Sequence, residues 1–231
     1  MKILSWNIAH RSNDHALKYA LEQEKADLIF FQECFHPLTY LTKQEFQNFS
    51  DKYLWEPTGN GWGNLTLSKN TGISEVAIEH KFKGRILVSK VALPDWGEMT
   101  LINFHTPITG RFSRYNLQEM FQLTKEHILK GNTIICGDLN FGECFDKNGK
   151  TECGDILKKI LEDYNIIDCY RIFNPSIGQT FRPSRNPDSL IHIDYIFVMK
   201  DLENRVKNCE ILFNDQIKKI SDHHPVVAVL D

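Results

Sequence analysis

Short apolar runs recur along the whole chain, and polar or turn-forming residues bound each of them. Runs that are continuous and rich in β-branched or aromatic residues predict strands buried on both faces. We expect such strands at 2–8, 27–31, 99–104, 133–136, 191–198, 206–213 and 226–230. Between 53 and 93, glycine and asparagine separate shorter runs at 65–67, 76–78 and 86–91, a pattern that predicts antiparallel strands and hairpins.

Other stretches follow the helical period instead. We expect helices at 38–48, where the pattern is weakest, at 112–130 and at 154–164. A further helix is expected to begin at Ser12 or Asn13, because either side chain can cap it. Gly131 ends the helix expected at 112–130. Residues 172–190 contain three prolines and are expected to form an irregular loop.

The order of these elements bounds the fold. A strand, a helix and a second strand open the chain as a plausible βαβ unit. Strands and helices then mix over the whole length, and no repeat, low-complexity segment or linker interrupts them. We therefore expect one α/β domain over residues 1–231, with two packed sheets and flanking helices.

Composition narrows the possible classes of protein. The chain has 231 residues and a net charge of −3, which argues against binding nucleic acid through bulk positive charge alone. A nuclease whose bound metal faces the phosphate stays possible. The six cysteines show no C-x-x-C spacing, so we expect reduced thiols, and a Cys144–Cys153 disulfide has no support. Because we find no signal peptide and no apolar run of membrane-spanning length, we expect a cytoplasmic protein, monomeric by default.

Polar residues that can bind metals or move protons stand at six predicted strand ends: Asn7, Glu33, His105, Asp138 with Asn140, Asp194, and Asp222 with His223. Burying one unpaired carboxylate costs on the order of several kcal/mol. The strand ends therefore either point to separate places or surround a divalent cation. Other chemistries lack their motifs, since the chain has no Walker loop, no G-x-S-x-G elbow and no G-x-G-x-x-G.

In their order and spacing these motifs resemble the endonuclease/exonuclease/phosphatase superfamily, the group with the deoxyribonuclease-I-like fold. The motifs cover residues 6 to 225 and are Trp6-Asn7, Gln32-Glu33, Phe104-His105, Gly137-Asp138-Leu139-Asn140, Ile193-Asp194-Tyr195 and Ser221-Asp222-His223. The resemblance implies a four-layer α/β sandwich in which two packed mixed β-sheets lie between helices.

The resemblance also implies a metal site. Glu33 would be the main protein ligand of Mg²⁺, or of Mn²⁺ in its place. Asn7 and Asp222 would lie near the metal, and Gln32 would support the ligands without binding the metal itself. Mg²⁺ prefers oxygen ligands and would neutralise charge on a phosphate that water attacks in line.

Further roles follow from the same resemblance. His223 would be the general base, and Asp194 would fix its tautomer. Asp138 would orient the attacking water or help to protonate the leaving group. His105 would bind phosphate or protonate the leaving group. Asn140 would bind phosphate, and Arg114 would bind phosphate or brace Glu33. Arg111 and Arg114 both open the helix expected after His105. His224 is expected to be structural.

The expected activity is a Mg²⁺-dependent phosphoesterase that hydrolyses phosphodiester bonds, with a nuclease as the first choice. The alternatives are a phosphatase for a small phosphorylated molecule or nucleotide, and a catalytically inactive binding module of the same fold. The partner is therefore nucleic acid or a phosphorylated small molecule, which the loops at 55–62 and 182–185 could select. The sequence Gln32-Glu33-Cys34-Phe35 differs from the Gln-Glu-Thr-Lys of the apurinic-site endonuclease branch, which argues against that repair role.

Overall fold

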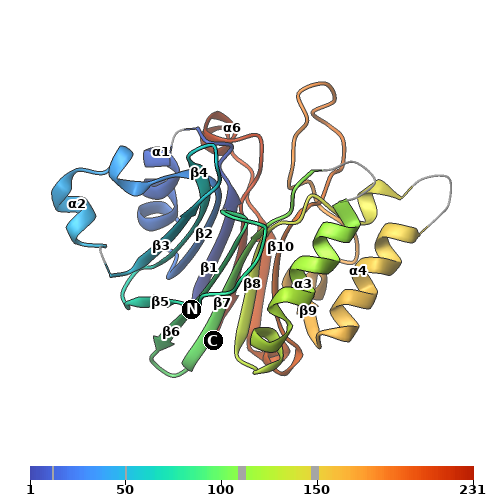
Figure 1. Cartoon of the computed structure of the whole chain (residues 1–231). Coiled ribbons are helices and arrows are strands. Elements are labelled where there is room, and N and C mark those ends of the chain that lie inside the picture. Colours follow the sequence, from blue (N-terminus) through green and yellow to red (C-terminus); the bar gives the residue numbers. More distant parts are fainter. Residues whose placement is uncertain (12, 50, 109–112, 147–150) are drawn as a thin grey trace.

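The computed structural model describes residues 1–11, 13–49, 51–108, 113–146 and 151–231. The expectations for Ser12 and Arg111 lie outside these residues. Two six-stranded mixed sheets pack face to face, and helices cover their outer faces (Figure 1). The predicted four-layer α/β sandwich is confirmed.

The first sheet has the strand order β11-β12-β1-β2-β4-β3. Its strands are β1 (Lys2–Asn7), β2 (Leu28–Phe35), β3 (Tyr53–Pro57), β4 (Trp62–Ser68), β11 (Val206–Ile211) and β12 (Val226–Leu230). Strands β1 and β2 run parallel, whereas β12 runs antiparallel to β1 with Val226 opposite Ser5. The end of β1, the end of β2 and the start of β12 therefore lie at one edge of the sheet.

The second sheet has the order β5-β6-β7-β8-β10-β9. Its strands are β5 (Ile73–Glu75), β6 (Ile86–Leu93), β7 (Gly97–His105), β8 (Thr133–Asp138), β9 (Ile166–Asp168) and β10 (Asp194–Met199). Only β7 and β8 pair in parallel within this sheet's described ladders. Their carboxyl ends therefore meet the start of β10, which is antiparallel to β8.

Helices flank the two sheets (Figure 1). They are α1 (Asn13–Lys18), which continues as a π-helical turn over Tyr19–Gln23, α2 (Lys43–Gln47), α3 (Ser113–Leu129), α4 (Glu152–Asp163), α5 (Cys169–Phe173) and α6 (Asp215–Ile220). Short 3₁₀ turns cover Pro37–Thr39, Glu143–Phe145 and Lys200–Arg205. Among the described residues, no helix combines the length and the apolar character that a membrane span requires.

Several predicted boundaries were wrong. The strand expected at 76–78 lies instead at Ile73–Glu75. Val76, just past that strand, still donates its N–H to the Val88 carbonyl at 2.9 Å, and Val76 and Ile78 pack against the core. The strand expected from residue 191 begins at Asp194, and Ile191 makes only an isolated bridge to Phe181. The expected helix at 38–48 is reduced to a 3₁₀ turn and the short α2. Three short elements were not predicted: β9, α5 and α6.

Candidate active site

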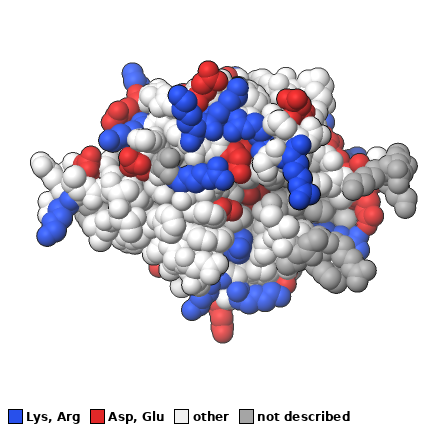
Figure 2. Space-filling view, turned by 90° about the horizontal axis from the view of Figure 1, so that it is seen from above, with Lys and Arg blue, Asp and Glu red and all other residues white. Residues whose placement is uncertain are grey.

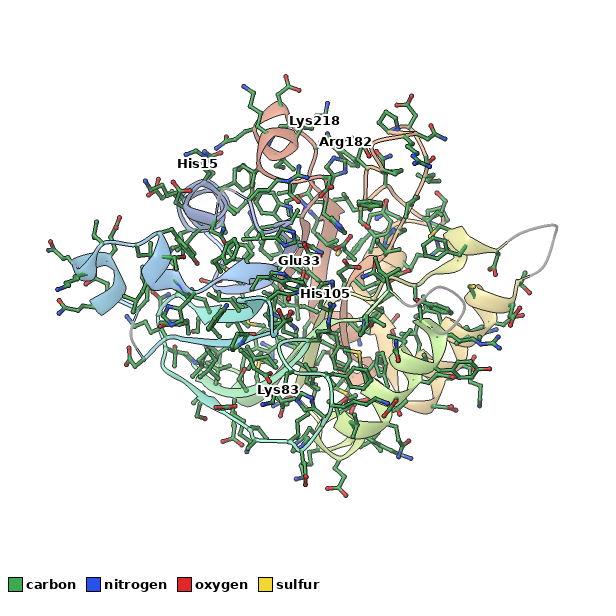
Figure 3. The ribbon with its side chains drawn as sticks, turned by 45° about the horizontal axis from the view of Figure 1, so that its top comes forward. His15, Glu33, Lys83, His105, Arg182 and Lys218 are labelled. Atoms are coloured by element: carbon green, nitrogen blue, oxygen red, sulfur yellow. The ribbon has the colours of Figure 1, made fainter. Side chains whose placement is uncertain are left out.

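Strand ends from both sheets bring most of the predicted residues together. The parallel pair β1 and β2 holds Asn7 and Glu33 at the same edge. In the second sheet, His105 is paired opposite Asp138, and Asp138 opposite Asp194. Glu33 and His105 lie next to each other at the centre of this end of the molecule (Figure 3).

The amide of Asn7 joins the two sheets. Its Nδ2 donates to Asp138 Oδ2 at 2.9 Å and to Glu33 Oε1 at 3.3 Å. The backbone N–H of Ala9 donates to Asn7 Oδ1 at 2.9 Å and so keeps the amide nitrogen toward the carboxylates. Asn7 therefore stabilises two neighbouring acids here, and its predicted place near a metal stays a prediction.

Glu33 lies at an irregularity of β2 that directs its carboxylate into the site. The pairing of β2 with β4 changes register between Phe31 and Cys34, and Glu33 has a left-handed backbone with φ of 54°. This conformation costs a non-glycine residue about 1–3 kcal/mol. A backbone bond of 2.9 Å from His10 N to Glu33 O ties the bulge to the loop after β1.

A buried amide network from the second sheet supports this bulge. Asn103 of β7 donates through Nδ2 to the carbonyls of Phe31 at 3.1 Å and Leu65 at 3.0 Å. Gln32 donates to Asn103 Oδ1 at 2.8 Å, and Asn64 donates to the Asn103 carbonyl at 2.8 Å. The two carbonyls lie where the β2–β4 ladder is interrupted, so Asn103 supplies donors at that point.

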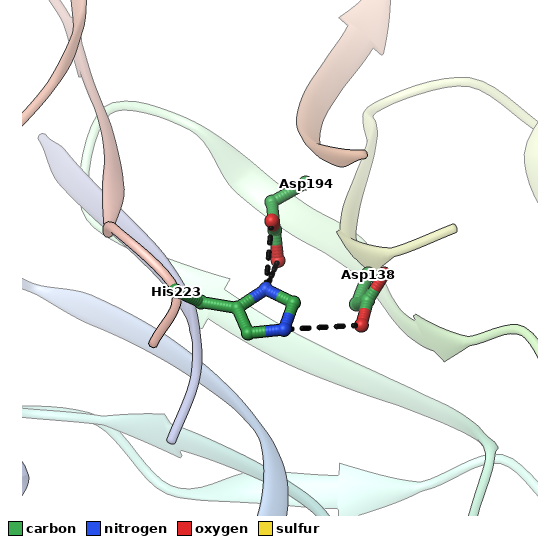
Figure 4. A group of neighbouring side chains, drawn as sticks. All are labelled: Asp138, Asp194 and His223. Carbon is green, nitrogen blue, oxygen red and sulfur yellow. Dashed lines mark hydrogen bonds and ion pairs between the residues drawn. The ribbon is translucent and has the colours of Figure 1, made fainter. Parts of the chain in front are cut away.

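His223 and Asp194 form a buried pair beside this centre (Figure 4). The Nδ1–H of His223 donates to the two Asp194 oxygens at 3.1 and 3.0 Å, and His223 Nε2 lies 4.0 Å from Asp138 Oδ2. The ring is therefore oriented with Nε2 toward the other acid. Burial lowers the pKa of His223, but the charge and hydrogen bond of Asp194, with the charges of Asp138 and Asp222, outweigh it and raise that pKa to about 9.

The loop before β12 is held in place through Ser221. Its hydroxyl donates to the Asn7 carbonyl at 2.7 Å and accepts from the backbone N–H of His223 at 3.0 Å. The indole of Trp6 donates to the His223 carbonyl at 3.0 Å. His224 turns away, since its Nδ1 lies 3.0 Å from the Gln179 carbonyl. The loop therefore gives the two neighbouring histidines different surroundings.

Asp138 is seated by the glycine before it. Gly137 has φ of 146°, and a Cβ there would stand 1.9 Å from the Phe104 carbonyl, so only glycine lets β8 approach β7 so closely. Asn140, with a left-handed φ of 47°, donates its backbone N–H to Asp138 Oδ1 at 2.9 Å and its Nδ2 to the Thr106 carbonyl at 2.9 Å. Burial first, then the charge of Asp194, raises the pKa of Asp138 to about 7.

His105 is enclosed and neutral. Its side chain is 3% exposed, and its Nε2 lies 3.5 Å from Glu33 Oε1 and 3.9 Å from Asp138 Oδ2. Burial first, then the positive charges of Arg85, His223 and His10, hold its pKa well below the usual value.

The donor set fits a divalent cation. Oxygens of Asp138 and Asp194 and a nitrogen of His223 lie within 4.8 Å of one another, but His223 and Asp194 bond to each other, so the acids left to face a cation are Asp138 and Glu33, which Asn7 links. Two adjacent buried carboxylates are unfavourable without compensating positive charge. Carboxylate oxygens of this kind are the ligands that Mg²⁺ prefers.

Two predicted residues have partners at the periphery. Asp222 Oδ2 lies 3.9 Å from Arg11 Nη2, and its side chain is 34% exposed. The guanidinium of Arg114 pairs with Glu152 of α4 and lies 4.7 Å from the ring centre of Tyr115. A contact of Arg114 with phosphate or with Glu33 would require it to leave these partners.

The structure adds two residues that the sequence analysis missed. His10 Nδ1 lies 2.8 Å from Glu33 Oε2. Arg85 lies 5.1 Å from the ring centre of Trp62, which also stands 5.4 Å from His10 and 5.6 Å from His105. Trp62 is the first residue of β4 and lies in the range 55–62 that was predicted to select substrate. The only sequence signal for His10 is its place three residues after Asn7.

Basic side chains surround the acids on this face, as Figure 2 shows from above. Arg182 Nη2 donates to the Lys218 carbonyl at 3.2 Å, and Figure 3 shows Lys83 on the other side of Glu33 and His105. A polyanion that approaches this end would therefore meet positive charge around these acidic side chains.

Comparisons with known proteins agree with this geometry. A model described as "Endonuclease/Exonuclease/phosphatase family" matches residues 4–223. A comparison with curated proteins gave no match.

Solved structures of the same fold cover this chain almost completely. An AP endonuclease from Archaeoglobus fulgidus is 21% identical with a TM-score of 0.74, covering 100% of this chain and 99% of its own. The AP endonuclease LMAP from Leishmania major is 17% identical with a TM-score of 0.74, covering 99% and 87%. The 3′ phosphatase NExo from Neisseria, bound to a product DNA hairpin, is 17% identical with a TM-score of 0.75, covering 100% and 99%. At these identities the likeness shows the fold.

Proposed function

Because the chain belongs to the endonuclease/exonuclease/phosphatase family, whose members hydrolyse phosphoester bonds, we propose that it is a Mg²⁺-dependent phosphodiesterase acting as a nuclease. Glu33 would hold the metal; Asn7 would join it after turning its amide oxygen toward the ion, and Asp222 after leaving Arg11. Bound there, Mg²⁺ supplies positive charge that neutralises the phosphate and favours attack by water. A phosphatase for a phosphomonoester at a nucleic-acid end is the second candidate, since NExo is described as a 3′ phosphatase and shares the fold.

The observation that carries the proposal is the orientation of His223. Asp194 fixes the proton on Nδ1, so Nε2 is the free nitrogen and faces Asp138. That nitrogen takes a proton from water as the oxygen attacks phosphorus and the opposite P–O bond breaks. Positive charge held at Glu33 favours neutral His223, the form that a base requires.

Groups on the second sheet serve the leaving oxygen and the phosphate. Asp138 is the proposed proton donor: without a metal its pKa rises to about 7, and positive charge at Glu33 would lower it from there. His105 is neutral and borders both Glu33 and Asp138, so it can donate to a phosphate oxygen. Asn140 contributes a phosphate contact, and Arg114 does so only if it leaves Glu152.

The surroundings support a charged substrate in a reducing compartment. The basic side chains on this face suit nucleic acid better than a neutral ester. The six cysteines are free thiols, which supports a cytoplasmic location.

The test is hydrolysis of a substrate panel by purified protein with Mg²⁺, Mn²⁺ or EDTA. The panel contains single- and double-stranded DNA, RNA, abasic-site DNA, 3′-phosphorylated DNA, nucleotides and inositol phosphates. We expect metal-dependent cleavage of phosphodiesters and a loss of at least about 100-fold in kcat for Glu33→Gln, because that variant removes the main charged ligand.

Each other outcome is informative. Turnover of phosphomonoesters alone would replace the nuclease by the phosphatase. If no phosphoester reacts with any metal, and Glu33→Gln leaves metal binding unchanged, the enzyme proposal fails.

A further inference from the structure

A histidine nitrogen lies beside the carboxylate of Glu33. His10 Nδ1 is 2.8 Å from Glu33 Oε2, on the side of the carboxylate opposite the atom that faces Asn7 and His105. Two adjacent ligands of an octahedral ion at about 2.1 Å stand roughly 3.0 Å apart. The two side chains are therefore spaced as neighbours around a single ion.

The backbone holds His10 in that place independently of the side-chain contact. His10 has a left-handed φ of 43°, and its N–H donates to the Glu33 carbonyl at 2.9 Å. Glu33 itself is left-handed, so two strained residues face each other across one backbone bond. Backbone strain of this kind persists where surrounding contacts hold the residue in its conformation, and it concentrates at functional sites.

Trp62 fixes the imidazole from its other side. Its ring lies 5.4 Å from the His10 ring at an interplanar angle of 35°, and 5.6 Å from His105 at 40°. Arg85 covers the same indole at 5.1 Å. The His10 side chain stays 45% exposed, so an ion from solvent can reach its nitrogen.

We propose that His10 is a direct ligand of the divalent metal held by Glu33, and that its nitrogen makes the site favour Mn²⁺ over Mg²⁺. This inference rests on the proposed metal site at Glu33. Mg²⁺ is hard and prefers oxygen, whereas imidazole nitrogen suits first-row transition metals. A purely oxygen-lined site would lack this source of discrimination.

The competing explanation is that His10 only positions Glu33 through a hydrogen bond. His10→Gln separates the two roles, because its side-chain amide can still donate to Glu33 but offers no imidazole nitrogen. His15→Gln is the matched control, since His15 of α1 is 67% exposed and contacts Asp14 (Figure 3 shows its place).

The experiment measures metal binding directly on the full chain. Calorimetry gives Mn²⁺ and Mg²⁺ affinities, and electron spin-echo modulation of bound Mn²⁺ detects a coordinated ¹⁴N. We expect the wild type and His15→Gln to show histidine nitrogen coupling. In His10→Gln we expect the coupling to vanish, Mn²⁺ affinity to fall at least tenfold and Mg²⁺ affinity to change less.

The outcomes separate this inference from the proposed function. Coupling that persists in His10→Gln but vanishes in His105→Gln overturns the inference, as does an unchanged Mn²⁺ preference. If Glu33→Gln binds Mn²⁺ as tightly as the wild type, the metal site itself is elsewhere and the proposed function fails with it.

Discussion

At the scale of single residues, adjacent histidines have unlike surroundings. His223 is bonded to Asp194, whereas His224 faces the Gln179 carbonyl. We expect His223→Asn to lower kcat by about 10²–10⁴-fold, because it removes the proposed base. The Asn amide can still donate to Asp194, so the thermal midpoint and the metal affinity should stay close to wild type. Steady-state kinetics on the preferred phosphoester, with calorimetry, checks this.

His224→Asn serves as the comparison for that variant. It should cost some stability but keep most of the turnover. A larger loss of kcat for His224→Asn than for His223→Asn would contradict the assigned roles.

Sequence could predict the acids and histidines at strand ends, because a buried apolar run followed by a polar group is a local pattern. It could not predict His10 beside Glu33, since that contact depends on left-handed backbone at both residues. It also gave no sign that Arg114 pairs with Glu152, because the two lie on separate helices.

At the scale of elements, the bulge of β2 depends on a residue of the other sheet. Asn103→Leu would leave the Phe31 and Leu65 carbonyls without their donor, at a cost of about 1–3 kcal/mol each. We expect lower stability in urea unfolding and also weaker metal binding by the folded protein, because Glu33 follows directly on the supported segment.

Ser89→Ala is the control for Asn103→Leu. Ser89 Oγ is buried in β6 and has no hydrogen-bond partner among the described residues, so its loss should change neither quantity much. If Asn103→Leu is destabilised yet binds metal like the wild type, Asn103 supports the fold without positioning Glu33.

The long elements were predictable, whereas the short ones were not. α3 and the buried strands carry enough apolar positions to fix their period. α6 has six residues and a single side-chain cap, Asn214 accepting from the Ile217 N–H at 2.8 Å. The apolar pair Val76 and Ile78 shifted the predicted strand past β5, because both side chains pack against the core and Val76 still bonds to Val88 beyond the strand's end.

At the scale of the whole molecule, stability depends on Asp168, an acid outside the proposed active site. Burial outweighs two backbone hydrogen bonds and raises the pKa of Asp168, at the end of β9, to about 7 from an ordinary 3.8. The folded state thus holds this proton more tightly than the unfolded state does. The stability it contributes is present at low pH and is lost as pH rises from about 4 to 7.

Asp168→Asn removes this dependence and keeps a side chain that can cap α5. Relative to the wild type, the variant should gain at least about 1 kcal/mol in unfolding free energy between pH 4 and pH 8. Urea unfolding of both proteins across that range measures the difference, and parallel curves would contradict the assignment.

The site draws Asn7 from β1 and His223 from the loop before β12, and these two strands are direct neighbours. During translation, residue 7 emerges long before residue 223, and β1 has no β12 to pair with until nearly the whole described chain has been made. A ribosome-bound nascent chain therefore lacks His223, the proposed base, and the β12 partner of β1. Under the proposed function, the growing polypeptide would be unable to hydrolyse phosphoesters, including those of the messenger that encodes it, until this late stage of synthesis.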